Sequence, residues 1–356
     1  MNKEKNDSQS MWGEKSQFFY ELDPDTVLNS LDQLGLKTTG RVLTLNSMEN
    51  RVYDIECDKL SVVAKFYRPG RWSKDQILEE HTFLTDLIDQ EIPVSAPLVF
   101  NKETLFTVPN KNIFFTLFLK RGGRLKDELN DEEIIKLGHT IARLHQVGKS
   151  KSATHRLSLT PKIFINDNVT YLLENNKIPG HLISQYKSLS SKLLNTAIKY
   201  FQNISFQRIH GDCHFGNILW RDEEFFLVDF DDAVNGPCIQ DLWPMIPADD
   251  PDSVIKRALL WDAYKEINVL AENEIKLVPI LRAMRVINYA AWIAKRFSDP
   301  AFVNTFPMFG SESYWKEQIQ ILQEIDSAIN TKDNEQVFYS YEENEPWTPP
   351  LDWEED

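Results

Sequence analysis

The sequence predicts an α+β protein of two lobes, a small antiparallel-sheet lobe with one long helix and a second lobe that is mainly helical. Its 356 residues exceed what one ordinary hydrophobic core holds. Strand-like patterns gather before residue 119 and helical patterns after it, which gives a first lobe of 17–118 and a second of 119–332. A hydrophobic content of 42% and a charged content of 26% are typical of a soluble globular protein.

The first lobe opens with an amphipathic helix over 25–35, because its apolar residues share one face and Gly35 follows the last turn. Ser73 and Gln76 form a capping box, which begins a long helix that ends near Gln90. Apolar runs bounded by turn residues predict the strands of this lobe, which are 51–56, 61–67, 105–108 and 112–119.

The second lobe opens with another capping box, formed by Asn130 and Glu133, and this helix ends near Gly148. The one clear strand signal in this half is a hairpin within 217–229 that turns at 222–224. Further helical patterns cover 183–202, 253–271, 274–297 and 314–330.

The two ends of the chain and its charge exclude several classes of protein. We expect residues 1–16 to be flexible and 333–356, which has no Lys or Arg, to be a disordered acidic tail. The net charge of -15 argues against a nucleic-acid partner. No signal peptide is visible, and no apolar run approaches the roughly 18–20 residues that span a membrane. Three cysteines without a CxxC pair indicate a reduced, cytoplasmic protein.

The most informative stretch is His210-Gly-Asp-Cys-His-Phe-Gly-Asn217, followed by Val228-Asp229-Phe-Asp-Asp232. The hairpin brings Asn217, at its start, beside Asp229, at its end, and Asp212 lies one short loop earlier. Such hard oxygen ligands suit Mg²⁺. Phosphoryl transfer needs a metal on the phosphates, a carboxylate that accepts the hydroxyl proton and a cation. The sequence therefore predicts an ATP- and magnesium-dependent phosphotransferase with Asp212 as the base.

The cation is expected from the sheet lobe, where Lys65 is the only charge in the apolar run Val62-Val-Ala-Lys-Phe66. An unpaired ammonium would be costly there. Glu80 on the following helix can orient it, as the corresponding glutamate does in protein kinases. Glu79 is an equally spaced alternative.

With these motifs, the chain resembles the aminoglycoside phosphotransferase and choline kinase-like branch of the protein kinase fold. Within that branch it closely resembles bacterial serine/threonine protein kinases of the stress response. The resemblance covers about residues 25–325, and the stretches that carry it are 45–53, 65–69, 76–81, 210–222, 228–232, 235–237, 240–243 and 281–285.

The resemblance implies a bilobal kinase-like fold, with ATP between the lobes near the Phe118–Gly123 crossover. It implies that Ser47 contacts ATP, that Asp212 acts in catalysis, and that Asn217 and Asp229 bind magnesium. The branch pattern E-x-x-x-L-x-x-L favours Glu80 over Glu79. The nucleotide loop 46–50 departs from ordinary kinases, because it has no glycine.

Neighbouring polar residues are assigned supporting roles. We expect His210 to pack and hydrogen-bond, and Cys213 to be a small packed thiol. His214 either neutralises phosphate charge or supports the loop. The carboxylates of Asp231, Asp232 and Asp241 are expected to support loops and helix caps.

Several functions remain open at this stage, because the same base and metal serve any hydroxyl. By resemblance the acceptor is a Ser or Thr hydroxyl of a protein. We also expect the enzyme to be a monomer. The main alternative is a kinase of a small alcohol such as an aminoglycoside, choline or homoserine. A metallophosphoesterase lacks its second metal-ligand set here. A pseudoenzyme that only binds nucleotide does not fit the intact base and ligands.

Overall fold

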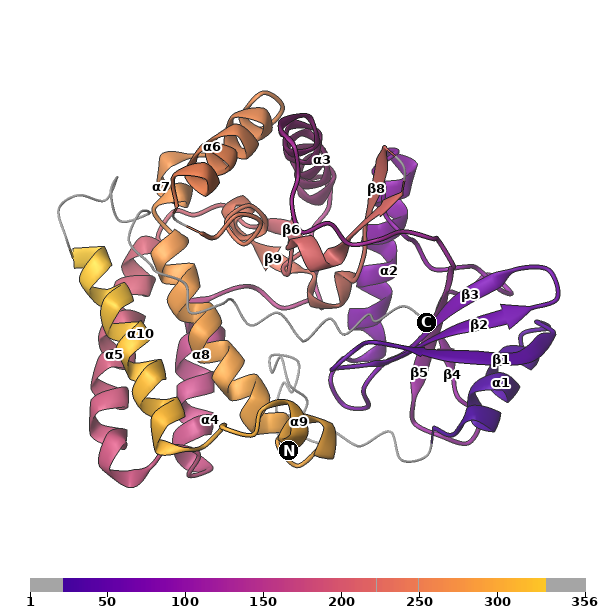
Figure 1. The fold of residues 1–356 in the computed structure, drawn as a ribbon, viewed down its shortest axis with the longest axis horizontal. Helices are drawn as coiled ribbons and strands as arrows, with labels where there is room; N and C mark the ends of the chain where they lie inside the picture. Colours follow the sequence, from indigo (N-terminus) through magenta and orange to yellow (C-terminus); the bar gives the residue numbers. More distant parts are fainter. Residues whose placement is uncertain (1–21, 222, 249, 331–356) are drawn as a thin grey trace, which may run out of the picture.

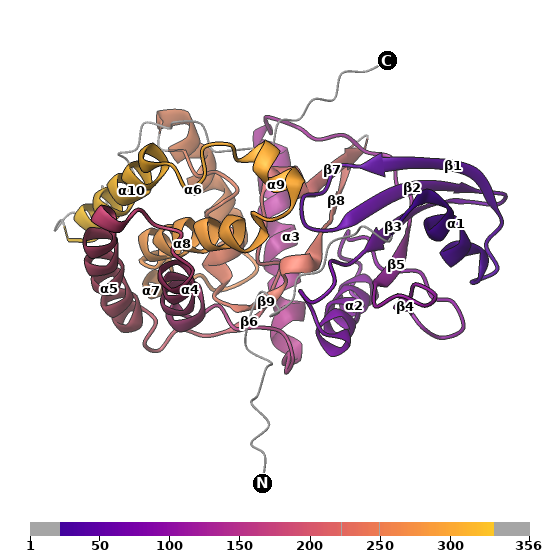
Figure 2. The same ribbon diagram turned by 90° about the horizontal axis from the view of Figure 1, so that it is seen from below.

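The computed structural model describes residues 22–221, 223–248 and 250–330 (Figure 1). The flexible N-terminus predicted for 1–16, the acidic tail predicted for 333–356 and position 222 of the hairpin turn lie outside these residues. Within them, a sheet lies at one end of the molecule and a group of helices at the other, so the predicted α+β, bilobal architecture is confirmed (Figures 1 and 2).

The sheet is antiparallel, with strand order β1-β2-β3-β5-β4. Helix α1 (Pro24–Asp32) lies against this sheet, and helix α2 (Lys74–Asp89) follows β3 (Figure 1). The capping box at Ser73 and Gln76 is formed as predicted. The strands are β1 (Thr38–Leu45), β2 (Arg51–Cys57), β3 (Ser61–Phe66), β4 (Phe106–Thr107) and β5 (Phe114–Leu119).

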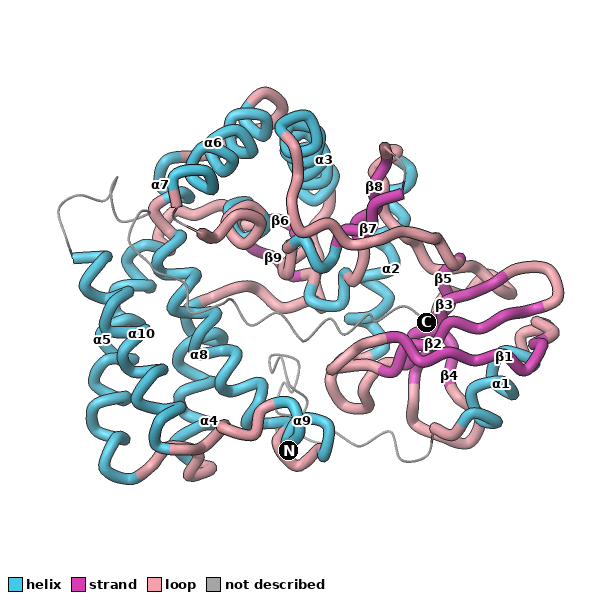
Figure 3. The backbone as a smooth tube through the Cα atoms, viewed as in Figure 1, coloured by secondary structure: helices cyan, strands magenta, loops and turns pink. Residues whose placement is uncertain are grey.

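The second half is mainly helical, as predicted (Figure 3). The second capping box, at Asn130 and Glu133, begins helix α3. The helices are α3 (Asp131–Ser150), α4 (Asn168–Glu174), α5 (Ile183–Tyr200), α6 (Pro251–Lys265), α7 (Glu272–Ile275), α8 (Val278–Arg296), α9 (Pro300–Thr305) and α10 (Glu312–Asn330).

Two small antiparallel sheets lie between the large sheet and the helices (Figures 1 and 2). The first pairs β6 (Gln207–Ile209) with β9 (Val234–Gly236). The second is the predicted hairpin of β7 (Ile218–Arg221) and β8 (Glu224–Leu227), in which Ile218 opposes Leu227. Sequence patterns missed β1, because its side chains are mostly exposed, and missed β6 and β9, because three residues show no alternation.

Two hydrophobic clusters make up the core. The smaller one joins α1 to one face of the large sheet, and the larger one runs through the helical half. The apolar face of α2, with Ile77 and Leu84, belongs to the larger cluster. The long helix of the first lobe therefore packs on the core of the second, which fixes how β3 and the hairpin face each other.

One stretch corrects the expectation that no apolar run reaches membrane-spanning length. Glu272–Arg296 is long and apolar enough by length and composition, but 61% of its most apolar window is buried within the fold. This degree of burial is typical of a core helix, which can be as long and as apolar as a helix that spans a membrane.

Helix α3 packs closely on two neighbours because two of its residues have no side chain. A Cβ atom at Gly138 would lie 2.7 Å from the carbonyl oxygen of Leu260 in α6. A Cβ atom at Gly148 would lie 2.1 Å from the carbonyl oxygen of Arg208 in β6, the strand that precedes the loop with Asp212. These glycines set the distance between α3 and that strand.

We expect Gly148→Ala to lower the free energy of unfolding by about 1–3 kcal/mol, because a backbone oxygen cannot move aside as a side chain can. Urea denaturation measures the change. Gly180→Ala is the matched control, since a Cβ atom there meets nothing within 4 Å. Equal stability of the two variants would contradict the packing argument.

Candidate active site

The direction of Lys65 follows from strand alternation. Its neighbours in β3, Ala64 and Phe66, point into the smaller hydrophobic cluster, so Lys65 points to the opposite face. There its Nζ lies 3.0 Å from Asp229 Oδ1 and 3.1 Å from Asp231 Oδ1. Glu80 Oε1 is 3.9 Å away. The predicted cation and one predicted metal ligand are thus brought together.

The ammonium of Lys65 is buried but remains charged. Burial lowers the pKa of Lys65, but the carboxylates of Asp229, Asp231 and Glu80 outweigh it and raise that pKa well above its ordinary value. Glu80 is also buried, and burial raises the pKa of its carboxyl although Lys65 and Arg156 oppose the change. The ion pairs therefore hold Lys65 in one position.

The two candidate glutamates, Glu79 and Glu80, contact different parts of the protein. Glu79 accepts backbone N–H bonds from Thr154, His155 and Arg156 at 2.6, 2.8 and 2.7 Å, and so supports the loop after α3. Glu80 faces Lys65, accepts from Arg156 Nη2 at 3.1 Å and accepts from the Tyr67 hydroxyl at 3.4 Å. The geometry agrees with Glu80 as the partner of Lys65.

The hairpin places Asn217 beside Asp229, as expected. The backbone N–H of Val228 donates to the carbonyl oxygen of Asn217 at 3.0 Å, so Asp229 directly follows the residue opposite Asn217. Asp229 has φ 59° and ψ 63°, a left-handed conformation that few non-glycine residues adopt. This turn leaves the Asp229 side chain 54% exposed beside Lys65.

Asp212 lies in a tight loop after Gly211, which has φ +87° and no room for a side chain, since a Cβ atom would lie 2.1 Å from Asp232 O. The side-chain amide nitrogen of Asn217 donates to the backbone carbonyl of Asp212 at 2.9 Å. The amide oxygen of Asn217 therefore points away from that carbonyl. The Asp212 carboxylate lies 3.4 Å from His214 Nε2 and 3.3 Å from Arg285 Nη1.

The electrostatics keep Asp212 ionised. Burial raises the pKa of its carboxyl, but the hydrogen bond from His214 and the charge of Arg285 outweigh burial, and the pKa lies below its ordinary value. His214 Nδ1 accepts the backbone N–H of Gly216 at 3.0 Å, so its proton sits on Nε2, facing Asp212. His214 therefore supports the loop in this structure.

A buried carboxylate holds the loop of residues 210–217, which is called the catalytic loop below. Asp241 accepts from the backbone N–H groups of His210 at 2.7 Å and Gly211 at 2.8 Å. It also contacts His145 Nε2 at 3.0 Å, and His145 Nδ1 lies 2.9 Å from the Tyr264 hydroxyl. His210 is buried as expected, with its ring nitrogen on the Val228 carbonyl at 2.9 Å. Asp241 thus acts as the predicted loop support.

Ser47 lies in the loop between β1 and β2, where its hydroxyl accepts the backbone N–H of Asn50 at 3.3 Å. Among the described residues, no contact joins Ser47 to Lys65, Asp212, Asn217 or Asp229. The structure therefore shows Ser47 as a turn residue, and its contact with ATP stays a prediction.

The same loop carries a buried carboxylate that sequence reasoning missed. Glu49 accepts from Arg296 at the end of α8 at 2.8 Å and from Trp292 at 2.8 Å, and it lies 3.2 Å from Arg68. Arg71 lies near Glu49 and pairs with Asp231 and Asp232. Arg68 and Arg71, two buried arginines that follow β3, thus contact the loop that carries Glu49, and Arg71 links this loop to the segment after Asp229. Arg296 links the same loop to α8.

Three features of the site appear only in the folded chain. Arg156 and Arg71 hold the acidic segment, and Arg285 contacts Asp212. A charge on a helix or loop is usually solvated, so no local pattern marks these arginines as partners of the site's carboxylates. Cys213 is buried as predicted, and burial raises the pKa of its thiol well above the ordinary value.

The donor set fits a hard cation. Among the described residues, no hydrogen bond or ion pair is seen at Asn217 Oδ1 or Asp229 Oδ2, and carboxylate and amide oxygens suit Mg²⁺. Within the same residues, no group of three or more His, Cys, Asp or Glu side chains could hold a metal alone. A cation between Asn217 and Asp229 would take its other ligands from water and phosphate oxygens.

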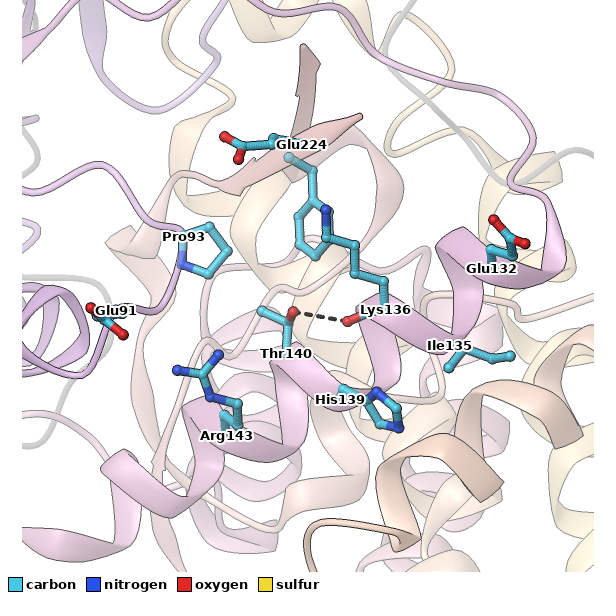
Figure 4. Close-up of a pocket in the computed structure, with 10 residues that line it drawn as sticks. Glu91, Pro93, Glu132, Ile135, Lys136, His139, Thr140, Arg143 and Glu224 are labelled. Atoms are coloured by element: carbon cyan, nitrogen blue, oxygen red, sulfur yellow. Dashed lines mark hydrogen bonds between the residues drawn. The ribbon is translucent and has the colours of Figure 1, made fainter. Parts of the chain in front are cut away.

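A cavity of about 640 Å³ lies away from these residues (Figure 4). Lys136, His139 and Arg143 of α3 line one side of it, and Glu224 of β8 lines another. None of the predicted site residues lines this cavity. The cavity therefore plays no part in the assignment of the site.

Comparisons with known proteins agree with this geometry. Residues 42–272 match the phosphotransferase enzyme family. Stress response kinase A of Escherichia coli strain K12 is 38% identical over 322 residues, which cover 86% of this chain and 95% of that protein. The chain belongs to the phosphotransferase enzyme family, and it is a kinase.

A second relative of the chain is the serine/threonine protein kinase RdoA of Salmonella typhimurium strain LT2. It is 37% identical over 302 residues, which cover 84% of this chain and 91% of the relative. The predicted resemblance is confirmed, and these relatives do not favour the small-molecule alternative.

Solved structures of other kinases share the fold. An amicoumacin kinase in complex with AMP-PNP, Ca²⁺ and Ami has a TM-score of 0.68 at 18% identity, covering 90% of this chain and 96% of that one. A microcompartment-associated aminopropanol kinase has a TM-score of 0.66 at 16% identity, covering 89% and 99%. At such identities the likeness concerns the fold alone.

The His145–Asp241 pair predicts a pH dependence of stability. Burial lowers the pKa of His145, but Cys238 and Asp241 beside the ring raise it to about 10. This value exceeds the pKa of about 6.5 in an unfolded chain. The pair therefore contributes its full stabilisation of the folded protein below about pH 6.5. We expect the stabilisation, a few kcal/mol, to be lost as the pH rises towards 10.

Urea denaturation between about pH 6.5 and pH 10 tests this expectation. The His145→Gln variant should show a flatter dependence, because its amide does not titrate. His181→Gln, whose imidazole is 59% exposed, is the control. Parallel curves for wild type and His145→Gln would show that His145 binds no extra proton in the folded protein.

Proposed function

We propose that this kinase transfers the γ-phosphate of ATP, with Mg²⁺, to a serine or threonine hydroxyl of a protein in the bacterial stress response. Support for a protein acceptor comes from its relatives, one named stress response kinase A and one a serine/threonine protein kinase. Support for the chemistry comes from one observation above all. The Lys65–Asp229 ion pair joins the sheet to the hairpin that also presents Asn217.

Each site residue receives a role in this proposal. Asn217 and Asp229 would hold the magnesium, which supplies charge neutralisation on the phosphate oxygens. Lys65 binds phosphate oxygens, and Glu80 keeps the ammonium in place. Ser47 contacts ATP through the loop that carries it. The nucleotide is expected near the Phe118–Gly123 crossover.

Asp212 accepts the proton of the acceptor hydroxyl as its oxygen attacks phosphorus. Its lowered pKa makes it a weak base that stays ionised at neutral pH. A weak base is sufficient, because phosphoryl transfer passes through a loose transition state in which positioning and electrostatics carry most of the catalysis. His214 and Arg285 orient its two carboxylate oxygens.

We also propose lobes of 17–118 and 119–332, and an enzyme that works as a monomer, since one chain supplies every group named above. The net charge of -15 argues against a nucleic-acid partner. A cytoplasmic location is supported by the cysteines, because Cys57, Cys213 and Cys238 are all free and buried.

Asp212→Asn is expected to lower the rate of phosphate transfer about 10²- to 10⁴-fold, because the amide cannot accept the hydroxyl proton. Transfer from γ-labelled ATP to protein fractions of the native host, and to the enzyme itself, measures this. ATP binding should persist. Asp252→Asn, an exposed carboxylate on α6, is the control. Full activity of Asp212→Asn would remove it as the base, and label appearing only on a small alcohol would contradict a protein acceptor.

Asp229→Ala is expected to abolish the gain in ATP affinity that Mg²⁺ provides, a loss of roughly tenfold or more. Lys65 keeps Asp231 and Glu80 as partners, so the fold should persist. Calorimetric titration with ATP, with and without Mg²⁺, measures the effect, and circular dichroism checks the fold. An unchanged magnesium effect would show that the metal binds elsewhere.

A further inference from the structure

Helix α8 differs in charge from the rest of the chain. Its residues Val278–Arg296 include four basic side chains and no acidic one, whereas the whole chain has a net charge of -15. Arg296 is paired with Glu49, and Lys295 donates to Asn168. Arg282 and Arg285 lie one turn apart in the first half of the helix and so share a face.

Arg285 is held at the catalytic base. Its Nη1 lies 3.3 Å from Asp212 Oδ1, and its guanidinium lies 6.0 Å from the ring centre of Trp243. Trp243 donates to Gln240, and Gln240 donates to the carbonyl of Gly211 in the catalytic loop. The guanidinium is therefore positioned by the same loop that positions Asp212.

The contact with Asp212 leaves most of the guanidinium available. An arginine has five N–H donors, and among the described residues the hydrogen bonding of Arg285 uses Nη1 alone. The side chain is 47% exposed. An acceptor hydroxyl must come within hydrogen-bond distance of Asp212, so the groups flanking that hydroxyl pass beside Arg285.

We propose that Arg285 selects acceptor peptides with a carboxylate next to the phosphorylated serine or threonine. This inference rests on the proposed function, because it assumes a protein acceptor. A flanking aspartate or glutamate would pair with the free donors of the guanidinium, whose planar fork matches a carboxylate. A lysine or other ammonium in that place would meet a like charge, which disfavours polycationic acceptors.

The nucleotide is the other anion that Arg285 could contact. The cation expected at the phosphates, Lys65, comes from β3 and contacts Asp229. Arg285 comes instead from α8 in the helical half and contacts the base that meets the acceptor. The two cations thus serve the two substrates, one on each side of the phosphate that moves.

The test uses full-length enzyme and peptides that share one serine and differ only in its flanking residues, which are aspartate, alanine or lysine. For wild type, kcat/KM should be highest with aspartate, by about fivefold over alanine, and lowest with lysine. Arg285→Ala should bring the aspartate-to-alanine ratio close to one. Arg285→Lys should keep part of the preference, and Arg285→Glu should favour the lysine peptide.

The ratio between peptides is the decisive measurement, because a general loss of activity or folding cancels in it. Arg41→Gln, a 60% exposed arginine on β1, should leave the ratio unchanged. A ratio unchanged in Arg285→Ala, or a raised KM for ATP without a change in the ratio, would overturn the assignment to the acceptor. If no peptide or protein is labelled while a small alcohol is, the proposed function fails instead.

Discussion

The structure depends on the buried ammonium of Lys65. A charge in an apolar strand is tolerated only where opposite charges meet it, and here the partners come from a helix, Glu80, and from the segment after the hairpin, Asp229 and Asp231. One side chain therefore determines how the sheet, α2 and the hairpin lie relative to one another. Lys65 and Asp229, the proposed phosphate-binding cation and the proposed metal ligand, cannot separate without exposing or stranding a buried charge.

The catalytic loop is rigid for a related reason. Its backbone N–H groups donate to the Asp241 carboxylate, and His145 of α3 contacts the same carboxylate. Its tight turn requires glycine at position 211. Asp212, the proposed base, is an ionised carboxylate with each oxygen contacted. This arrangement suits phosphoryl transfer, which depends on the position of charges more than on the strength of a base.

The nucleotide loop follows a different design from the glycine-rich loop of ordinary kinases. Glu49 is buried among Arg68, Arg71 and Arg296, so the loop is tied to α8 by ion pairs. Buried charges of this kind are costly to leave unpaired. A loop fixed by side chains needs less backbone freedom, which agrees with the absence of glycine from 46–50. The same helix α8 reaches the base through Arg285, so it contacts both ends of the site.

Sequence patterns predicted the two-lobed α+β fold, both capping boxes and the hairpin that joins Asn217 to Asp229, because periodicity, caps and turns are local. They missed β1, β6 and β9, whose exposure or shortness hides alternation. Spacing could not choose between Glu79 and Glu80, since adjacent helix residues differ only in what they face. The family pattern favoured Glu80, and the packing of α2 shows what each glutamate contacts. Packing also brought Arg285 and Glu49 to the site. Contacts between residues far apart in the chain depend on how helices pack, and no local pattern records that.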